Sequence, residues 1–449
     1  MRLERILVSG LVRRFDYDIP MNLNDRITII HGPNGFGKTV LLRLLAGLFS
    51  RSNGALVGTP FTEFKLEFEN AKFISVKRAE PTKKSQRAKE VPDLHFTFFD
   101  GSRSHEFTWH ESGREQIEIP FQLIDEVIPE LEREDRDMWR HEETGEFFTS
   151  QELALRFQHR LPFMAVPDVP DWLKQVRESV KVRFIQAERL QARPRERAPH
   201  GSKTPPTRAV KQYSQELGAI TKLTLTEYAA LSQSLDRTFP ARVVSQSSPL
   251  SNEELQRALK DIETKRARLV GAGLLEREGD EPTVAVPKQI DETRRAVLSV
   301  YVQDTHQKLS VLDNLAAKVE LFVNSINQRF QYKRISVSKD GFTLTTPEGE
   351  ILNPVHLSSG EQHEIVLLYE LLFKAPENSL ILIDEPEISL HVGWQEQFLS
   401  DLRAVASLTQ FDILIATHSP QIISTRWDLT VELKGPGHEA AVKATRHSK

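Results

Sequence analysis

The sequence predicts an α/β fold whose central sheet combines segments from both ends of the 449-residue chain. A β-rich segment at 26–30 runs directly into a glycine loop, and a leucine-rich helical pattern follows over 40–49. Near the other end, apolar strand segments at 380–383 and 412–416 alternate with helical patterns, which is typical of a parallel sheet. We therefore expect the long middle of the chain to be an insertion on this core.

The other elements follow from local patterns. Alternating or aromatic-rich segments predict strands at 6–8, 64–68, 96–99 and 181–186 and a hairpin over 335–345, with Lys339-Asp340-Gly341 at its turn. Residues 121–180 are expected to be mostly helical, with breaks near their prolines. We call the predicted α/β core the head. Its N-terminal part is expected at 1–60, followed by an inserted mixed lobe at 61–180. A strand, a basic loop and a helical arm are expected at 181–334. The C-terminal part of the head follows at 335–449.

Two apolar stripes predict helices in the insertion. Both repeat at spacings of three and four residues: Leu255, Leu259, Ile262, Arg266 and Leu269, then Leu312, Ala316, Val319, Val323 and Ile326. They fit either a short antiparallel coiled-coil-like hairpin or two amphipathic helices packed on the head. A basic, proline-rich stretch at 192–211 fits a nucleic-acid contact or, more commonly, a solvated loop.

The composition limits the classes of function. Net charge is −4, so binding to nucleic acid would depend on local basic patches. The chain has no cysteine, which excludes disulfides and thiolate chemistry and fits a reducing, cytoplasmic location. The charged N-terminus is unlike a signal peptide. No apolar run approaches the roughly 20 residues that span a bilayer, so we expect no membrane association.

The glycine loop predicts a site for a nucleoside triphosphate and Mg²⁺. It fits the pattern G-x-x-x-x-G-K-[ST] with Gly32, Pro33, Asn34, Gly35, Phe36, Gly37, Lys38 and Thr39. Small residues let backbone N–H groups point at phosphates, and the start of the following helix adds partial positive charge. Lys38 is expected to reach the β- and γ-phosphates, and the Thr39 hydroxyl to bind Mg²⁺. Phe36 is unusually large for its position, so its ring must pack elsewhere.

Catalytic groups are expected at the ends of the two apolar strands. Asp384 and Glu385 follow the first, at the strand edge where α/β ligands bind. Asp384 would hold Mg²⁺ and Glu385 would position or deprotonate the attacking water. An acidic pair that only caps the next helix is the simpler alternative. His418 follows the second strand and would orient the water near the γ-phosphate, although a lone histidine there is more often structural.

These motifs together resemble ABC-type ATPase heads. Residues 357–362 look like the signature motif of that family, and residues 388–391 like its D-loop in the form of RecF-like and OLD-like ATPases. The resemblance implies that Ser358, Ser359, Gly360 and Glu361 serve the γ-phosphate bound by a second subunit. ATP would then lie between two heads of a homodimer or larger homo-oligomer.

The resemblance also implies a glutamine that senses Mg²⁺ and water. Gln186 is the candidate, at the end of its predicted strand, with a surface glutamine as the alternative. Phe15 and Tyr17, upstream of the glycine loop, suit adenine stacking or core packing equally well.

The segments 357–364, 369–373 and 426–433 resemble stand-alone ATPases of bacterial anti-phage systems, in particular AriA-like ATPases of PARIS systems. Such a protein would regulate a separate Toprim-like nuclease and respond to a phage-encoded trigger. OLD nucleases carry their own Toprim domain, for which the residues after His418 are too few. A DNA-repair ATPase is the alternative, clamping duplex through Arg193, Arg195 and Arg197. The long insertion disfavours a third, a transporter ATPase subunit.

Overall fold

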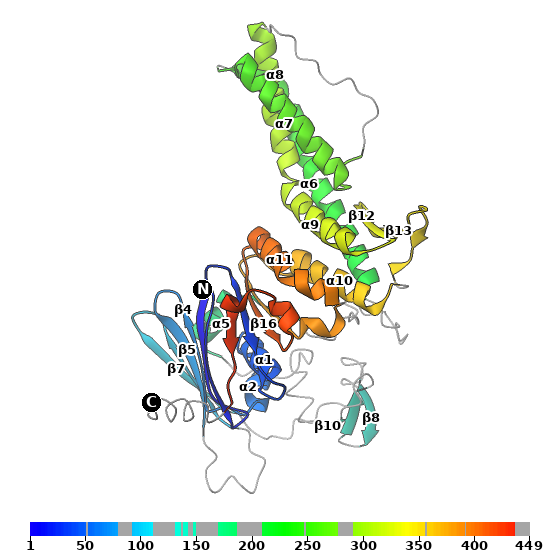
Figure 1. The fold of residues 1–449 in the computed structure, drawn as a ribbon. Coiled ribbons are helices and arrows are strands. Elements are labelled where there is room, and N and C mark those ends of the chain that lie inside the picture. The colour runs from blue at the N-terminus through cyan, green and yellow to red at the C-terminus, as the bar shows by residue number, and fades with distance from the viewer. Residues whose placement is uncertain are drawn as a thin grey trace, which may run out of the picture.

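The computed structural model describes residues 1–50, 53–79, 92–110, 131–135, 138–141, 147–149, 169–185, 209–246, 248–276, 291–354, 357–390 and 392–435. Figure 1 shows a head built on β-sheets, from which an arm of long helices projects. The central sheet of the head has five parallel strands. Their order is β11 (Val182–Ile185), β15 (Leu380–Asp384), β16 (Asp412–Thr417), β3 (Ile27–His31) and β17 (Thr430–Glu432). The predicted α/β head is confirmed, because strands from both ends of the chain pair directly.

Both faces of this sheet are buried, so its strands are apolar at successive positions. On one face, Ile29 and Ile415 join a core with α10 (Ser359–Tyr369) and α11 (Val392–Thr409). On the other face, Ile30 and Leu414 join a second core with α1 (Lys38–Leu48). The alternation places α1 and α10 on opposite sides of the sheet (Figure 1).

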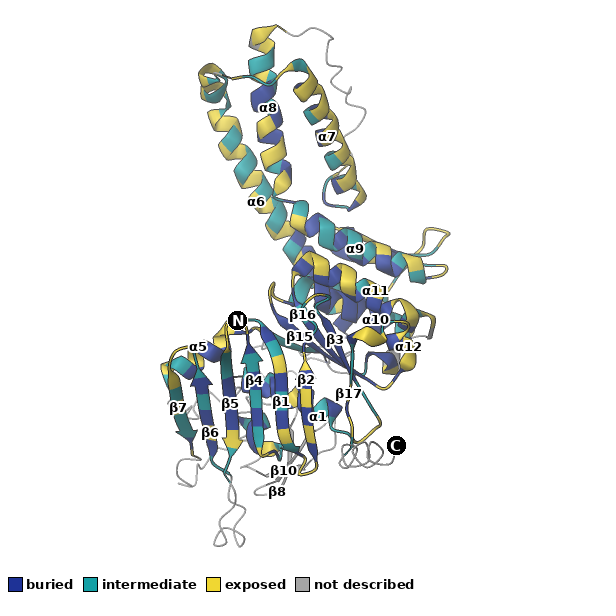
Figure 2. Ribbon diagram, turned by 60° about the vertical axis from the view of Figure 1, so that its left-hand side comes forward, coloured by how far each residue is buried: buried dark blue, intermediate teal, exposed yellow. Residues whose placement is uncertain are grey.

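A six-stranded antiparallel sheet packs beside α1. Its order is β2 (Phe15–Pro20), β1 (Leu3–Leu11), β4 (Glu63–Phe68), β5 (Lys72–Arg78), β6 (Leu94–Phe99) and β7 (Ser104–Trp109). Buried and exposed residues alternate along β2 without a break, as expected for a sheet with one covered face (Figure 2). Two short helices, α2 (Gly54–Gly58) and α5 (Asp171–Ser179), complete this part of the head.

The prediction of helix over most of 121–180 is wrong for three segments. β8 (Leu131–Asp135), β9 (Met138–His141) and β10 (Phe147–Thr149) form a small antiparallel sheet. The high charge of this region suggested exposed helix. However, Trp139, Phe147 and Phe148 favour strands, and a glycine lies between β9 and β10.

The arm contains more helices than the two stripes indicated. α6 (Ala209–Ser245), α7 (Asn252–Gly271) and α8 (Glu292–Ser310) lie together, and α9 (Asp313–Arg329) returns to the head (Figures 1 and 2). Both predicted stripes are largely buried, including Leu255, Ile262 and Val319. α7 begins with a capping box in which Ser251 and Glu254 satisfy each other's backbone N–H. None of the described helices combines the length and apolarity needed to cross a membrane.

A β-hairpin links the arm to the second half of the head. β12 (Arg334–Ser338) pairs with β13 (Gly341–Thr345), and β14 (Ile351–Leu352) adds a short third strand. Gly341 has a φ of 111°, and a Cβ there would lie 2.1 Å from the Ser214 carbonyl oxygen on α6. The predicted hairpin is confirmed, and its glycine also lets α6 pack directly against the turn.

The remaining elements are short and lie in the C-terminal half. The π-helical turn η4 (Glu370–Lys374) continues α10, and the 3₁₀ turn η5 (Pro386–Ser389) follows β15. After β16 come α12 (Pro420–Ile423) and the 3₁₀ turn η6 (Trp427–Leu429).

Candidate nucleotide-binding site

The carboxyl ends of the parallel strands bring the predicted groups to one edge. His31 pairs with Thr417, and Asp384 pairs with Ala416, so β3, β15 and β16 end nearly level. The phosphate loop, the acidic pair and His418 follow these three ends. This is the edge at which α/β folds bind ligands.

The phosphate loop has the backbone that its glycines allow. Gly35 and Gly37 have φ values of 84° and 77°, in the left-handed region that other residues rarely adopt. α1 begins directly after Gly37, and no acidic side chain occupies its first turn. The N–H groups at the start of α1 are therefore available to an anion.

As expected, the ring of Phe36 packs outside the phosphate loop, on an aromatic side chain of β2. Its ring stacks on Phe15 at a centroid distance of 5.4 Å, and Phe15 stacks on Tyr17 at 5.7 Å. The Tyr17 hydroxyl donates to the Phe36 carbonyl oxygen at 2.7 Å. Phe15 and Tyr17 are both buried, so they support the loop as core residues.

Lys38 is buried within the loop that it serves. Its Nζ donates to the carbonyl oxygens of Gly32 and Pro33 at 2.8 and 3.1 Å. Burial lowers the pKa of Lys38, and the carboxylates that follow β15 oppose this change. The ammonium group is held at the loop by weak neutral acceptors, which a phosphate would outcompete as a charged partner.

Thr39 and Asp384 form a suitable pair of magnesium ligands. The Thr39 hydroxyl donates to Asp384 Oδ1 at 2.9 Å, joining the start of α1 to the end of β15. Burial raises the pKa of Asp384, and the hydrogen bond from Thr39 partly opposes this change. No cluster of three or more metal-binding side chains occurs among the described residues. Mg²⁺ commonly binds through one or two protein oxygens together with phosphates, and this pair fits that pattern.

Glu385 stands at a sharp turn directly after β15. Its φ and ψ are 43° and 59°, a left-handed conformation that is uncommon outside glycine. Its N–H donates to the Ala416 carbonyl oxygen at 2.8 Å, which fixes the turn to the neighbouring strand. Glu385 Oε1 lies 3.6 Å from His418 Nδ1, and 44% of the His418 side chain is exposed. The two predicted catalytic groups are therefore adjacent.

The predicted signature residues lie at the start of α10. Ser358 caps this helix and forms a capping box with Glu361, whose carboxylate also binds Lys333 Nζ at 2.8 Å. Burial opposes ionisation of Glu361, but bonds from Lys333 and Ser358 leave its pKa below the ordinary value. Ser358 and Ser359 are exposed. Across the described ranges, no hydrogen bond or ion pair joins Ser358, Ser359 or Gly360 to the phosphate loop.

Two further predictions fall on other parts of the chain. Gln186 lies just beyond β11, outside the described residues, as does the basic stretch up to residue 208. β11 pairs in parallel with β15, Ile185 opposite Ile383. The strand that leads to Gln186 therefore ends at the same edge as Asp384.

Sequence reasoning missed Glu387, two residues after Glu385. Its carboxylate is buried, and its Oε1 is 3.1 Å from His418 Nδ1. The segment Asp384-Glu385-Pro386-Glu387 carried the available signal, a third carboxylate within one turn of the strand end.

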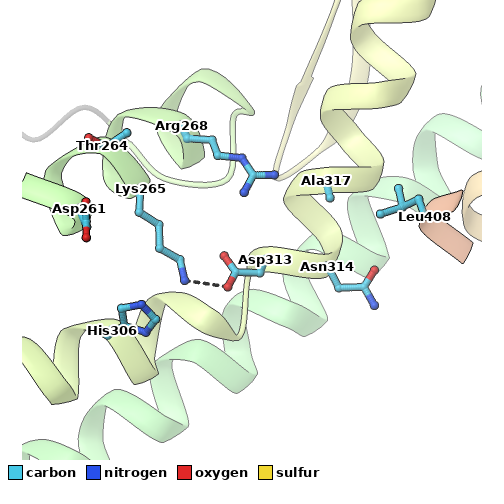
Figure 3. A pocket seen from close by; sticks show the side chains of 9 residues that line it. All are labelled: Asp261, Thr264, Lys265, Arg268, His306, Asp313, Asn314, Ala317 and Leu408. Carbon is cyan, nitrogen blue, oxygen red and sulfur yellow. Dashed lines mark hydrogen bonds and ion pairs between the residues drawn. The ribbon is translucent and has the colours of Figure 1, made fainter. Parts of the chain in front are cut away.

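A separate pocket lies where the arm meets the head (Figure 3). Residues of α7, α8, α9 and α11 line it: Asp261, Thr264, Lys265, Arg268, His306, Asp313, Asn314, Ala317 and Leu408. Two of its cations are already paired, Lys265 with Asp313 at 2.7 Å and Arg268 with Glu320 at 2.7 Å. These pairs stabilise the packing of α7 on α9 rather than converging on a ligand.

Comparison with known families accounts for most of the chain. Residues 27–424 match the family described as "AAA domain, putative AbiEii toxin, Type IV TA system". The chain belongs to this family. It is a P-loop protein of the ATPase class, as the phosphate loop predicted.

Among solved structures, the chain is similar to heads of SMC proteins. One is the Smc head domain of Pyrococcus furiosus with an extended coiled coil, bound to the C-terminal domain of ScpA. The similarity covers 99% of both chains at 12% identity, with a TM-score of 0.32. Another is the SMC head domain of Thermotoga maritima, at 11% identity over 94% of this chain and 91% of that one, with a TM-score of 0.31.

Proposed function

We propose that this protein is an ATP-hydrolysing switch whose active sites form between two copies of the chain. The observation that carries the proposal is the convergence of Lys38, the Thr39–Asp384 pair and the Glu385–His418 pair at one sheet edge. Lys38 and the N–H groups of α1 bind the phosphates, and Thr39 and Asp384 would hold Mg²⁺. The metal, when bound, supplies positive charge that stabilises the transferred phosphoryl group.

The hydrolytic step needs a water activated beside the γ-phosphate. Glu385 accepts a proton from this water or orients it, and His418 contacts the γ-phosphate side. Ser358 and Ser359, at the start of α10, are exposed in the single chain and carry hydroxyl and N–H donors. In the proposed dimer they reach the phosphate bound by the other copy, as donors aimed at a developing negative charge.

Trans-complementation tests this two-chain site. Lys38→Ala disables the phosphate side and Ser359→Arg disables the signature side, so either variant alone should be nearly inactive. In a mixed dimer, one of the two sites combines wild-type Lys38 with wild-type Ser359. Co-expressed variants should therefore recover about a quarter of wild-type hydrolysis under random pairing. A mixture as inactive as its components, or a fully active Ser359→Arg protein, would contradict the proposal.

We propose further that this switch acts in bacterial anti-phage defence and controls a separate effector, such as a nuclease. The support is the resemblance of the signature and C-terminal segments to defence ATPases and the toxin–antitoxin description of the family. The arm offers a surface for a protein partner away from the nucleotide edge.

A phage-challenge assay tests the biological role. The gene and its neighbours are placed in a sensitive bacterial host, with wild-type chain or Lys38→Ala. Protection against phage should be present with the wild type and lost with the variant. Equal plaque counts for both across a phage panel would contradict the defence role without affecting the enzymatic one.

A further inference from the structure

Glu387 holds the segment that carries His418 through a single carboxylate oxygen. Its Oε1 accepts the Thr417 hydroxyl at 2.7 Å and the His418 backbone N–H at 2.9 Å. The same oxygen lies 3.1 Å from His418 Nδ1. Both the backbone position and the ring of His418 therefore depend on one buried side chain, of which 7% is exposed.

Glu387, rather than Glu385, is the carboxylate nearer to the ring. The 3.6 Å between Glu385 Oε1 and His418 Nδ1 exceeds a hydrogen bond, whereas the distance from Glu387 is within range. A carboxylate only accepts, so this close contact favours the form of the ring that carries a proton on Nδ1. In neutral His418, Nε2 then carries no proton and can only accept a hydrogen bond, and 44% of the side chain is exposed.

A second pair of buried groups fixes the same two turns. Gln395 on α11 donates from Nε2 to the Leu390 carbonyl oxygen at 3.0 Å, which braces the turn after η5. Its Oε1 accepts the Ser419 hydroxyl at 3.0 Å. The turn after β15 and the turn after β16 are thus joined twice, by Glu387 and by Gln395.

The energetic cost of Glu387 points to a role beyond packing. Its Oε2 is buried and has no hydrogen-bond partner in the described parts of the chain. A buried carboxylate oxygen without a partner destabilises a fold. A neutral residue could cap the Thr417 hydroxyl and the His418 N–H at lower cost, so the charge is better explained by the ring that it faces.

We propose that Glu387 is the positioning residue for His418, fixing its Nδ1 proton so that Nε2 can accept a hydrogen bond from the attacking water beside the γ-phosphate. This role rests on the proposed ATPase function. In this role Glu387 acts through His418 and not directly on the nucleotide.

The test is a double-mutant cycle with a spectroscopic readout. Glu387→Gln keeps an acceptor for Thr417 and the backbone but removes the charge. It should lower kcat about tenfold with little change in KM, the size seen when a partner behind a functional histidine is lost. In a His418→Ala background, Glu387→Gln should cause no further loss. Glu432→Gln is the matched control at the end of β17, and it should leave kcat unchanged.

The ring is observed directly by long-range ¹⁵N–¹H NMR of the ¹⁵N-histidine-labelled full chain, with His418→Ala identifying the signal. Wild type should show the Nδ1-protonated form, and Glu387→Ala should shift the population toward Nε2–H; melting temperatures confirm that each variant is folded. An unchanged tautomer in a folded Glu387→Ala protein, or a Glu387→Gln effect equally large without His418, would overturn the proposal. The NMR readout needs no ATP, so absent hydrolysis in wild type would refute the ATPase function separately.

Discussion

The phosphate-loop side and the signature side of the proposed site are positioned by different interactions. The phosphate side follows strand ends whose backbones pair in register, such as His31 with Thr417. The signature side lies at the start of α10, a helix that forms ion pairs with Arg329 and Lys333 where the arm joins the head. Lys333 binds Glu361 at 2.8 Å, and Arg329 pairs with Glu364, both of them buried.

This difference indicates which side of the site could change position when a partner binds. Backbone pairing within a buried sheet leaves little freedom to the phosphate loop. The signature helix forms its ion pairs with Arg329, the last residue of α9, and with Lys333 just after it, so we expect a change in the arm to reach Ser359. Three variants separate the two sides, beginning with the largest expected effect.

Glu385→Gln tests the phosphate side. The amide cannot accept the proton of the attacking water, so hydrolysis should fall by about 100-fold or more. ATP binding should persist, and dimers should accumulate in the presence of ATP. Hydrolysis is measured by phosphate release and dimer formation by light scattering. An unchanged rate would contradict the assignment of Glu385, and Glu432→Gln serves as the control carboxylate.

Arg329→Met tests the signature side. Burial lowers the pKa of Arg329 to about 10, and its guanidinium pairs with Glu364 on α10 and Asp401 on α11. Removing the cation leaves buried carboxylates unpaired, which should cost about 3 kcal/mol of unfolding free energy in urea denaturation. Hydrolysis should fall while ATP affinity is retained.

The control for this variant is Arg5→Met, which breaks the solvent-exposed pair between Arg5 and Asp18. Its effect on stability should be much smaller, because water screens and replaces exposed ion pairs. Equal stability of the two variants would show that the ion pairs of Arg329 do not stabilise the junction of α9 with α10 and α11.

Asp384→Asn should have the smallest effect on stability, and in the opposite direction. Burial raises the pKa of Asp384 above its unfolded value, so the ionised form destabilises the fold at neutral pH. Asparagine removes this cost and still accepts from Thr39, which should stabilise the nucleotide-free protein by up to about 1 kcal/mol.

The sign of the pH dependence provides a check. The gain from Asp384→Asn should shrink as the pH falls through the raised pKa, because wild-type Asp384 is then protonated and also neutral. Thermal melting across acid and neutral pH measures this difference, with and without Mg²⁺ and ATP. Mg²⁺-dependent stabilisation in the variant equal to wild type would exclude Asp384 as a metal ligand.

Prediction from sequence succeeded where a local pattern fixes the backbone. The phosphate loop, the hairpin at 335–345 and the apolar strands were all recognisable from neighbouring residues. Prediction failed at β8, β9 and β10, where charge masked the strand-forming aromatic residues. α6 and α8 were also missed, because exposed arm helices carry only a narrow apolar stripe.

The sequence by itself determined where the phosphate loop, the acidic pair and the histidine stand, each at the end of a strand. These are short-range features, in which a glycine or a carboxylate acts through its own backbone position. Only the tertiary structure decided that Glu387 faces His418 and that Arg329 joins the arm to the signature helix. Such contacts form between segments that are distant in sequence. Because the charged groups are buried, the loss of one partner leaves the other without solvation, which is costly.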